Sequence, residues 1–357
     1  MNDRTMTLRL GEHLVGDGQP CWIVAEIGIN HNGELDLAKE NIRAAASAGA
    51  NAVKFQSFSA EEFLADPELK HSYRDAGNVL IEETQYAMFK RLELPAAWHA
   101  ELQRHAREQN VGFFSSAADA GAADLLCSLG VPAIKLASEY LINIELLKHV
   151  ARQPLPVILS AGMASPEEIA AALALFAHRR DLALLHCVSV YPTPAESLNL
   201  RRIQSLRREY GVLTGYSDHS VGIEAAAAAV CLGACMVEKH FTIDKRLPGP
   251  DHAFSASPDE FGAMVARIRL VERMLGDGDL NFADIERPGR TSFRRGIVAA
   301  AFIAAGQRIA PDLLAYKRPC VGLKPIDREL LLGRRARRDL APNTPITLAD
   351  VEGGEPC

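Results

Sequence analysis

Short apolar runs alternate with longer stretches of helical spacing from about residue 21 to residue 275. The runs are short enough for strands and lack polar alternation, which is typical of strands buried on both faces. The eight runs span residues 22–27, 52–55, 112–115, 133–136, 156–159, 182–187, 212–215 and 235–238. The stretches between and after them predict helices at residues 35–48, 95–109, 118–129, 144–152, 166–178, 198–210, 221–232 and 257–275.

Local signals mark the ends of several of these helices. Residues 165–168 (Ser-Pro-Glu-Glu) and 257–260 (Ser-Pro-Asp-Glu) each offer a Ser cap, a Pro at the first helical position and acidic residues in the first turn. Gly49, Gly130 and Gly233 fall where helices should stop. The order of elements is therefore strand then helix, repeated along the chain.

Strand–helix units of about thirty residues, eight in a row, predict an α/β fold of the (β/α)8 TIM barrel type. A doubly wound open sheet is the alternative, but the chain has no glycine-rich dinucleotide fingerprint, which favours closure. The connection at residues 61–85 is long, polar and aromatic. We interpret it as an excursion over the mouth of the barrel.

The pattern changes near Gly276. We expect a catalytic barrel domain over residues 1–276, a linker rich in Gly, Asp and Arg over residues 277–291, and a small β-rich domain over residues 292–357. So short a segment makes a marginal core, and we expect it to pack against something else.

Composition narrows the class of protein. Of the 357 residues, 48% are hydrophobic and 24% are charged, as in soluble globular proteins. The net charge of −6, without a basic stripe, argues against nucleic acid as a partner. Residues 1–4 carry no apolar signal and no run reaches the length of a membrane span, so we expect no membrane association. Seven Cys, an odd number and mostly in apolar runs, predict reduced thiols in a cytoplasmic protein and no cysteine zinc site.

Polar side chains follow all eight predicted strands, where a barrel of this kind places its active site. In chain order they are Glu26, Lys54, Gln56, Ser115, Ser116, Lys135, Ser138, Glu139, Ser160, Ser189, Tyr191, Ser217, His219, Glu238 and His240. Residues two apart in a strand share a face, so Lys54 lies beside Gln56 and Glu238 shares a face with His240. Lys239 should point outward, as a helix-packing or loop residue. Because buried charge is costly unless it is paired or used, the clustering indicates a functional site.

His219 and His240 end the last two predicted strands. If those strands are neighbours, the two imidazoles make half of a metal shell and leave positions open for water and substrate. The alternative is that each is a hydrogen-bonded structural histidine, since the chain has 11 His.

Lys54 and Lys135, with several Ser hydroxyls, suit an anion with many acceptor oxygens, such as a phosphate together with a carboxylate. The chain has no P-loop, which argues against a nucleotide. A buried lysine could instead form a Schiff base, as in a class I aldolase, but a paired metal site argues against the need for one.

The motifs resemble the sialic acid synthase (N-acetylneuraminate synthase) family, which makes nonulosonic acids from phosphoenolpyruvate and a 2-acetamido sugar. The matching segments are residues 25–28 (Ala-Glu-Ile-Gly), 30–33 (Asn-His-Asn-Gly), 53–56 (Val-Lys-Phe-Gln), 158–163 (Ile-Leu-Ser-Ala-Gly-Met), 191–194 (Tyr-Pro-Thr-Pro), 215–219 (Gly-Tyr-Ser-Asp-His), 238–241 (Glu-Lys-His-Phe) and 248–252 (Pro-Gly-Pro-Asp-His). Residues 294–300, with Gly306, resemble the family's antifreeze-like (SAF) domain. The match covers nearly the whole chain in order.

The resemblance implies a divalent metal, Mn²⁺ or Mg²⁺, held by His219 and His240. It also implies a domain-swapped homodimer, in which an arginine matching Arg295 reaches from one subunit to the N-acetyl group bound in the other. The family's phosphoenolpyruvate contacts match Lys54, Ser115 or Ser116, Lys135, Ser138, Ser160, Ser189 and Ser217. Its sugar contacts match Gln56, Tyr191 and Asp251.

The implied reaction condenses phosphoenolpyruvate with an open-chain sugar of the N-acetylmannosamine type and releases phosphate. C3 of phosphoenolpyruvate attacks the aldehyde, water attacks C2, and phosphate leaves by C–O cleavage. Glu26 or Glu238 would orient or deprotonate that water, and either could instead hold a lysine or a histidine ligand in place.

Three departures from the family pattern lie around the substrates. Ser138 is followed directly by Glu139 and Tyr140 where the family has Ser-x-Glu, so the carboxylate comes one position early and would turn away if the strand stays extended. Ser189 stands where Asn is frequent, and Ala161 where Thr is frequent.

These departures leave the acceptor open. It could be N-acetylmannosamine, or a 2,4-diacetamido-6-deoxy sugar as for legionaminic acid, pseudaminic acid or a spore or surface polysaccharide. Two interpretations from other classes also stay open: a pyruvate-dependent metal aldolase, which would release no phosphate, and a non-catalytic sugar-binding barrel, against which the intact histidine pair argues.

Overall fold

The computed structural model describes residues 5–75 and 77–353, and the chain divides into two compact units between Gly276 and Asp277. In the first unit, eight parallel strands close into a barrel, which confirms the predicted fold. The strands are β3 (Trp22–Gly28), β4 (Ala52–Ser57), β7 (Gly112–Ala117), β8 (Ile134–Leu136), β9 (Val157–Ser160), β10 (Leu182–Cys187), β11 (Leu213–Asp218) and β12 (Met236–His240). They pair in chain order, and β12 returns to β3.

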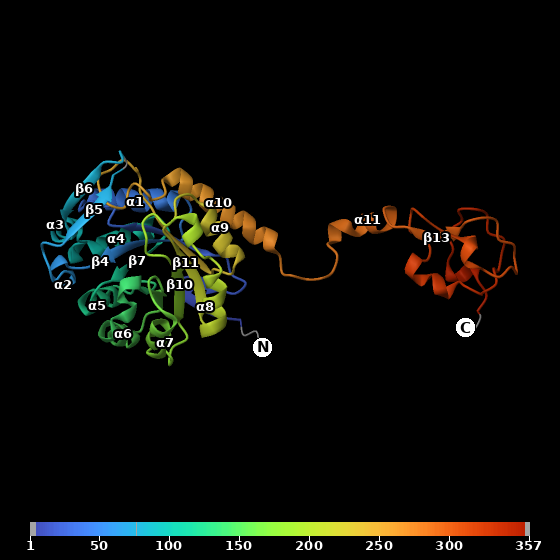
Figure 1. Ribbon diagram of the computed structural model, residues 1–357, viewed down its shortest axis with the longest axis horizontal. Helices are drawn as coiled ribbons and strands as arrows, with labels where there is room; N and C mark the ends of the chain where they lie inside the picture. Colours follow the sequence, from blue (N-terminus) through green and yellow to red (C-terminus); the bar gives the residue numbers. More distant parts are fainter. Residues whose placement is uncertain (1–4, 76, 354–357) are drawn as a thin grey trace. The chain divides into compact units, whose positions relative to one another are not determined.

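Helices surround this barrel (Figure 1). They are α1 (Leu35–Ser47), α4 (Ala96–Glu108), α5 (Ala120–Ser128), α6 (Ile144–Ala151), α7 (Pro166–Ala174), α8 (Arg202–Tyr210), α9 (Glu224–Cys231) and α10 (Pro258–Leu275). The predicted caps are present: Ser165 and Ser257 each accept a hydrogen bond from the N–H of the glutamate three residues on, and that glutamate accepts one back. These caps fix the first turns of α7 and α10.

The interior of the barrel is apolar at the amino ends of the strands and polar at their carboxyl ends. Trp22 and Glu26 lie four residues apart in β3, so both face the interior. Trp22 packs against Phe114 of β7, with ring centroids 5.3 Å apart, and closes the barrel at the amino ends of the strands. Glu26 lies at the other end of the same face. The charged side chains therefore rest on an apolar plug and are reached only from the carboxyl ends of the strands.

Two hairpins were not predicted. The chain opens with β1 (Thr7–Leu10) and β2 (His13–Gly16), whose inner residues are buried. The long connection after β4 holds α2 (Ala60–Phe63), then the antiparallel pair β5 (Lys70–Arg74) and β6 (Leu80–Thr84), then α3 (Gln85–Leu92). Strands of four or five residues with alternating exposure give little apolar signal in the sequence.

The second unit has its own apolar core, which includes Ile297, Ile303, Leu340 and Ile346. Its regular strands among the described residues, β13 (Gly296–Ala299) and β14 (Leu314–Lys317), are antiparallel. Isolated bridges and the short helices η4 (Pro311–Leu313), η5 (Pro325–Leu330) and η6 (Leu348–Asp350) complete it. The segment expected to be a plain linker contains η3 (Asp284–Glu286) and a short helix, α11 (Arg287–Ser292).

Within the described residues, no helix is long and apolar enough to cross a membrane. Six cysteines in this part of the chain are unpaired. The expectations for Cys357 and for residues 1–4 fall outside the described residues.

Candidate active site

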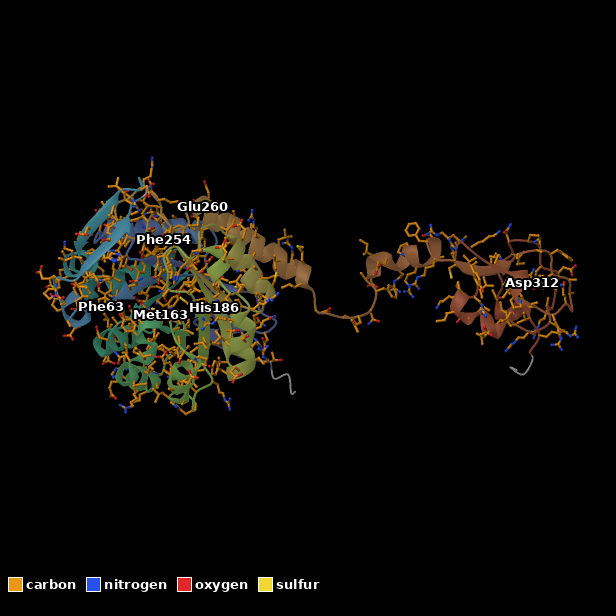
Figure 2. The ribbon with its side chains drawn as sticks, viewed as in Figure 1. Phe63, Met163, His186, Phe254, Glu260 and Asp312 are labelled. Atoms are coloured by element: carbon orange, nitrogen blue, oxygen red, sulfur yellow. The ribbon has the colours of Figure 1, made fainter. Side chains whose placement is uncertain are left out.

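A pocket of about 1050 Å³ opens at the carboxyl ends of the barrel strands. Its lining combines strand ends with the connections that follow them and with the β5–β6 hairpin. Phe63, Met163 and Phe254, which all line it, come from three separate segments of the barrel unit (Figure 2). The predicted site residues among the lining are Gln56, Ser138, Ser189, Tyr191, His240 and Asp251.

Next to this pocket lies a buried group of four charged side chains, Glu26, Lys54, Lys135 and Glu238. Lys54 Nζ lies 2.7 Å from Glu26 Oε2 and 3.8 Å from Glu238 Oε2. Lys135 Nζ lies 3.6 Å from Glu238 Oε1, which also accepts a 2.9 Å hydrogen bond from the Ser217 hydroxyl. Two ammonium groups thus face two carboxylates, and the charges balance. We call these four residues the charged quartet.

The two carboxylates of the quartet differ in their proton affinity. Burial raises the pKa of Glu26 to about 7, and the neighbouring Glu238 charge adds to the effect of burial while Lys54 opposes it. Burial also acts on Glu238, but Lys135, Lys54 and Ser217 together hold its pKa below the usual value. Glu238 is therefore the permanent anion of the quartet, and Glu26 is the carboxyl that can exchange a proton near neutral pH.

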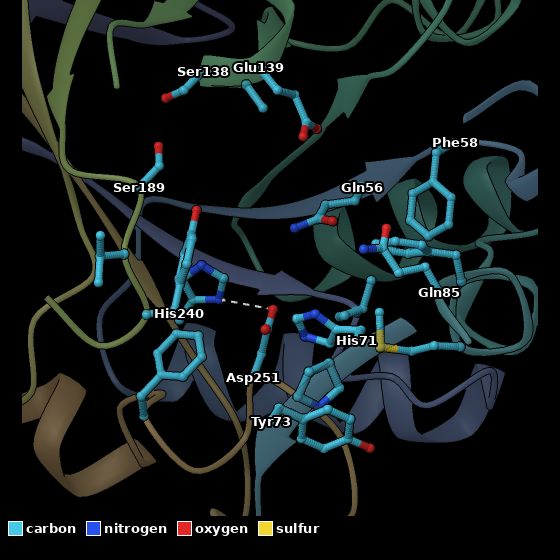
Figure 3. Close-up of a pocket in the computed structure, with 18 of the residues that line it drawn as sticks. Gln56, Phe58, His71, Tyr73, Gln85, Ser138, Glu139, Ser189, His240 and Asp251 are labelled. Carbon is cyan, nitrogen blue, oxygen red and sulfur yellow. Dashed lines mark ion pairs between the residues drawn. The ribbon is translucent and has the colours of Figure 1, made fainter. Parts of the chain in front are cut away.

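The two histidines lie together beside the quartet. Their ring centroids are 5.4 Å apart, and the Tyr191 ring packs against both, at 4.1 Å from His219 and 5.9 Å from His240. His219 Nδ1 lies 2.8 Å from the carbonyl oxygen of Val188, which fixes the proton on Nδ1 and leaves Nε2 with a lone pair. His240 Nδ1 lies 3.5 Å from Asp251 Oδ2 (Figure 3) and has no hydrogen-bond partner among the described residues.

This arrangement fits a divalent metal. One imidazole is oriented by a backbone carbonyl, as is usual for ligating histidines, and the other keeps a buried nitrogen without a partner. Within residues 5–75 and 77–353, no third His, Cys, Asp or Glu joins them in a metal-binding group. The protein would supply two ligands, and the rest of the shell would be left to water and substrate.

Hydroxyl groups approach the backbone closely at Gly162. The Gly162 N–H donates to Ser138 Oγ at 3.0 Å. A Cβ at this position would lie 2.4 Å from Ser189 Oγ and 2.6 Å from Ser138 Oγ, so only glycine leaves room for both hydroxyls. The nearby Ser160 hydroxyl is buried and has no partner among the described residues. These three hydroxyl groups can donate hydrogen bonds to a bound anion.

Ser115, predicted as a substrate contact, lies on the helix side of β7. Its hydroxyl is 2.7 Å from that of Ser57, which in turn is 2.7 Å from Nε2 of His99 in α4. Strand alternation turns the next residue, Ser116, inward, where it lines the pocket. The placement therefore favours Ser116 over Ser115.

Glu139 was expected at a strand end but was assigned no substrate contact, because it would turn away if the chain stayed extended after Ser138. Instead β8 ends at Leu136, and a 3₁₀ helix, η1 (Ser138–Ile142), begins. Glu139 and Tyr140 both line the pocket, and Figure 3 shows the Glu139 carboxylate on the same side as Ser138. Burial raises the pKa of Glu139, and a hydrogen bond with Tyr140 opposes that rise. The early carboxylate thus still reaches the pocket.

Lys239 points away from the barrel interior, as its position in β12 predicts, but it is neither a loop nor a simple packing residue. It is buried, and its ammonium donates to Asp218 Oδ2 at 2.9 Å and to the carbonyl of Ser220. Asp218 Oδ1 accepts hydrogen bonds from the Tyr216 hydroxyl and from Ser220. This network holds the turn that carries His219.

Arg295 belongs to the second unit. It is exposed and immediately precedes β13. The remaining predicted residues, Glu26, Lys54, Lys135, Ser217, Glu238 and His219, lie beneath or beside the pocket as described.

Comparisons with known proteins find matches in both units of the chain. The model of the NeuB family matches residues 41–280, and that of the SAF domain matches residues 294–352. An N,N'-diacetyllegionaminic acid synthase of Legionella pneumophila is 38% identical over 94% of this chain and 96% of its own length. The crystal structure of an N-acetylneuraminic acid (sialic acid) synthetase from Leptospira borgpetersenii is 35% identical, with a TM-score of 0.72 over 80% of this chain and 95% of that one. The structure of the spore coat polysaccharide biosynthesis protein SpsE from Bacillus subtilis is 37% identical, with a TM-score of 0.66 over 98% of this chain and 100% of that one.

Proposed function

Because the chain belongs to the NeuB family, we propose that it is a nonulosonic acid synthase, which joins phosphoenolpyruvate to an open-chain 2-acetamido sugar and releases phosphate. This is the reaction expected from the sequence, and the membership expected there is confirmed. The observation that carries the proposal is the charged quartet beside the histidine pair, at the mouth of a closed barrel. In this reaction the quartet would serve the anion and the histidine pair the aldehyde.

Phosphoenolpyruvate would bind at the lysines. Lys54 and Lys135 supply positive charge for its phosphate and carboxylate, and buried hydroxyls supply hydrogen bonds. The hydroxyls placed for this are those of Ser116, Ser138, Ser160, Ser189 and Ser217. Because the quartet is already neutral, the arriving anion displaces carboxylate contacts of the lysines rather than meeting unpaired cations.

Glu26 is the residue we assign to the water that attacks C2. Its pKa of about 7 suits a group that takes a proton near neutral pH. Glu238 is committed to Ser217 and the two lysines, and it keeps those lysines charged. Gln56 donates a 3.2 Å hydrogen bond to Glu26 Oε1 and lines the pocket, so it connects this carboxyl to the sugar side of the site.

His219 and His240 would hold the divalent metal, for which Mn²⁺ or Mg²⁺ is our proposal. When bound, it would supply polarisation of the sugar aldehyde. Tyr191 and Asp251, which contact the two histidines, would orient the sugar around that position. Burial raises the pKa of Asp251 to about 6.

The acceptor is a 2-acetamido sugar in both remaining alternatives, N-acetylmannosamine or a 2,4-diacetamido-6-deoxy sugar. We also propose that the reaction is cytoplasmic and that the protein is a domain-swapped homodimer in which Arg295 serves the neighbouring subunit's site. The exposed position of Arg295 at the start of the second unit's core supports that role.

The test is phosphate release from phosphoenolpyruvate with a panel of acetamido sugars, with and without chelator. We expect acceptor-dependent phosphate release that chelation abolishes and Mn²⁺ or Mg²⁺ restores. His219→Ala should abolish turnover while the barrel stays folded by circular dichroism. Release of no phosphate with any acceptor would contradict the proposal and favour an aldolase or a non-catalytic barrel.

A further inference from the structure

The pocket extends beyond the catalytic groups to a wall of aromatic side chains. Phe58 follows β4, Phe63 ends α2 and Phe89 lies in α3, and all three line the pocket. Phe89 meets Phe58 and Phe63 edge-on, with ring centroids 5.3 Å and 4.9 Å away. Met88 and Ile29, both buried, lie at the back of the same group. None of these residues serves the chemistry proposed above.

The β5–β6 hairpin completes this wall. His71 and Tyr73 lie two residues apart in β5, are less exposed than their neighbours, and stack with ring centroids 5.8 Å apart. Glu83 of β6 accepts a hydrogen bond from the Tyr73 hydroxyl at 3.1 Å and two from Arg91 of α3 at 2.8 and 3.0 Å. The hairpin is thereby tied to α3, which carries Phe89.

The wall also holds an amide. Gln85 begins α3 and lines the pocket, and its side-chain amide has no hydrogen-bond partner in the part of the chain that the structure describes. An amide offers both a donor and an acceptor, which is the pattern that complements an acetamido group. In Figure 3, Phe58, Gln85, His71 and Tyr73 lie on one side of the pocket, and Ser138, Ser189 and His240 lie on the other.

We propose that this wall, made by Phe58, Phe63, Phe89 and Gln85, reads the distal end of the acceptor and selects a sugar that carries a methyl group and a second acetamido group there. The inference rests on the proposed function, since it assumes that the aldehyde end of the acceptor lies at the histidines. With that end fixed, the rest of the open chain extends across the pocket toward the wall. Three aromatic rings accept a methyl group but give a hydroxyl no partner. The acceptor class is then a 2,4-diacetamido-6-deoxy hexose rather than fully hydroxylated N-acetylmannosamine.

The first measurement compares kcat/KM for the two acceptors, N-acetylmannosamine and 2,4-diacetamido-2,4,6-trideoxymannose, at saturating phosphoenolpyruvate. One methyl-sized difference in an apolar pocket changes kcat/KM by about 10- to 200-fold. We expect the native protein to prefer the trideoxy acceptor by at least about tenfold on that scale. Equal use of the two acceptors, or a preference for N-acetylmannosamine, would overturn the inference but leave the synthase function standing. Absence of phosphate release with both would instead contradict the function itself.

The second measurement changes the wall. Phe89→Gln makes this part of the surface polar and should reduce the preference at least about tenfold. Phe89→Leu keeps the surface apolar and should retain the preference. Gln85→Met removes the amide and should weaken use of the diacetamido acceptor while sparing N-acetylmannosamine. A preference ratio that stays unchanged in both Phe89→Gln and Gln85→Met would refute the assignment of the wall.

A matched control lies on the same helix. Tyr86 neighbours Gln85 but is absent from the pocket lining, and its hydroxyl contacts Glu61 on the outer surface. Tyr86→Gln should leave both kcat/KM values unchanged. Thermal stabilisation of each variant by phosphoenolpyruvate alone shows that the barrel and its anion site are intact, so a misfolded variant is distinguished from a change in acceptor selection.

Discussion

At the residue scale, this barrel keeps charged groups out of water only in closely matched sets. The quartet holds two positive and two negative groups at the mouth of the barrel. Lys239 and Asp218 form a second set, on the side of the strands that faces away from the barrel interior. A buried pair adds little net stability, but removing one partner leaves an uncompensated charge. Loss of a single member should therefore cost far more than the pair contributes.

Lys239→Met should lower the free energy of unfolding of the barrel by about 3–5 kcal/mol, because Asp218 is then buried as a lone anion. Urea denaturation followed by circular dichroism measures this change. The double variant Lys239→Met with Asp218→Asn should recover part of the loss. Lys245→Met, which breaks a partly exposed pair with Glu260, is the control and should cost less than about 1 kcal/mol. A similar cost for the two single variants would contradict the argument.

Acid sensitivity should come in part from two buried neutral histidines, His31 and His252. Burial lowers the pKa of each to about 4, against an ordinary value of 6.5. Between pH 6.5 and 4 the unfolded chain binds these protons and the folded chain does not, so stability is complete above pH 6.5 and declines as the pH falls toward 4. The slope is about 1.4 kcal/mol per pH unit for each histidine.

His252→Asn should therefore make the pH dependence of unfolding shallower across that window. The variant loses stability at pH 8, because His252 bonds to Thr242 and Asn32, but its decline from pH 6.5 to 4 should be smaller than that of the native protein. Urea denaturation at half-unit intervals of pH measures both slopes. Parallel curves would show that His252 does not contribute.

At the element scale, the strands were predictable because each is buried on both faces and reads as an uninterrupted apolar run. All eight barrel strands overlap their predicted ranges. The β5–β6 hairpin was missed because its residues alternate between exposed and half-buried and carry His, Tyr and Glu. Lys54, Lys135 and the two histidines could be picked out as candidate site residues because they lie at the ends of apolar runs.

The parts of the site that could not be predicted depend on the face that a strand residue occupies, on where a strand stops and on how an insertion folds. Ser115 and Ser116 differ only in which face of β7 they occupy, and the sequence marks both as polar. Glu139 reaches the pocket because η1 replaces the extended chain, a change that no cap or proline signals. The aromatic wall comes from an insertion whose fold the sequence left undefined.

Gly162, in the turn after β9, tests the anion site at this scale. Gly162→Ala should push the Ser138 and Ser189 hydroxyls aside, because its methyl group would lie 2.4–2.6 Å from them. Hydrogen bonds to a charged group contribute about 1.5–3 kcal/mol each, so KM for phosphoenolpyruvate should rise about 10- to 100-fold. Gly162 has no left-handed φ, so thermal stability should change little. Gly262→Ala, which meets only an ordinary contact in α10, should leave this KM unchanged.

At the scale of the whole molecule, the chain divides into a barrel that holds the charged quartet and histidines and a second unit with a separate core. If Arg295 completes the neighbouring subunit's site, the two units of one chain serve different sites. Activity should then depend on how variants are combined in a dimer and not only on which residues are present.

Co-expression of His219→Ala and Arg295→Ala chains tests this. Each variant alone should be inactive or nearly so. In a mixed dimer, the barrel of the Arg295→Ala chain receives an intact arginine from the other chain, so random mixing should restore about one-quarter of native activity. Phosphate release and sedimentation of the purified mixture measure activity and dimer content. If Arg295 acts within its own chain, the mixture stays inactive although mixed dimers form.

The β5–β6 hairpin and helices α2 and α3 form one uninterrupted stretch of chain between β4 and α4, and they add no strand to the barrel. The lysines and carboxylates of the quartet and the two histidines, by contrast, are spread over five strands or strand ends. Acceptor preference could therefore be changed by exchanging this one continuous segment, while the lysines, carboxylates and histidines stay the same. If the aromatic wall selects the acceptor, grafting residues 58–92 between homologous barrels should transfer acceptor preference together with the segment.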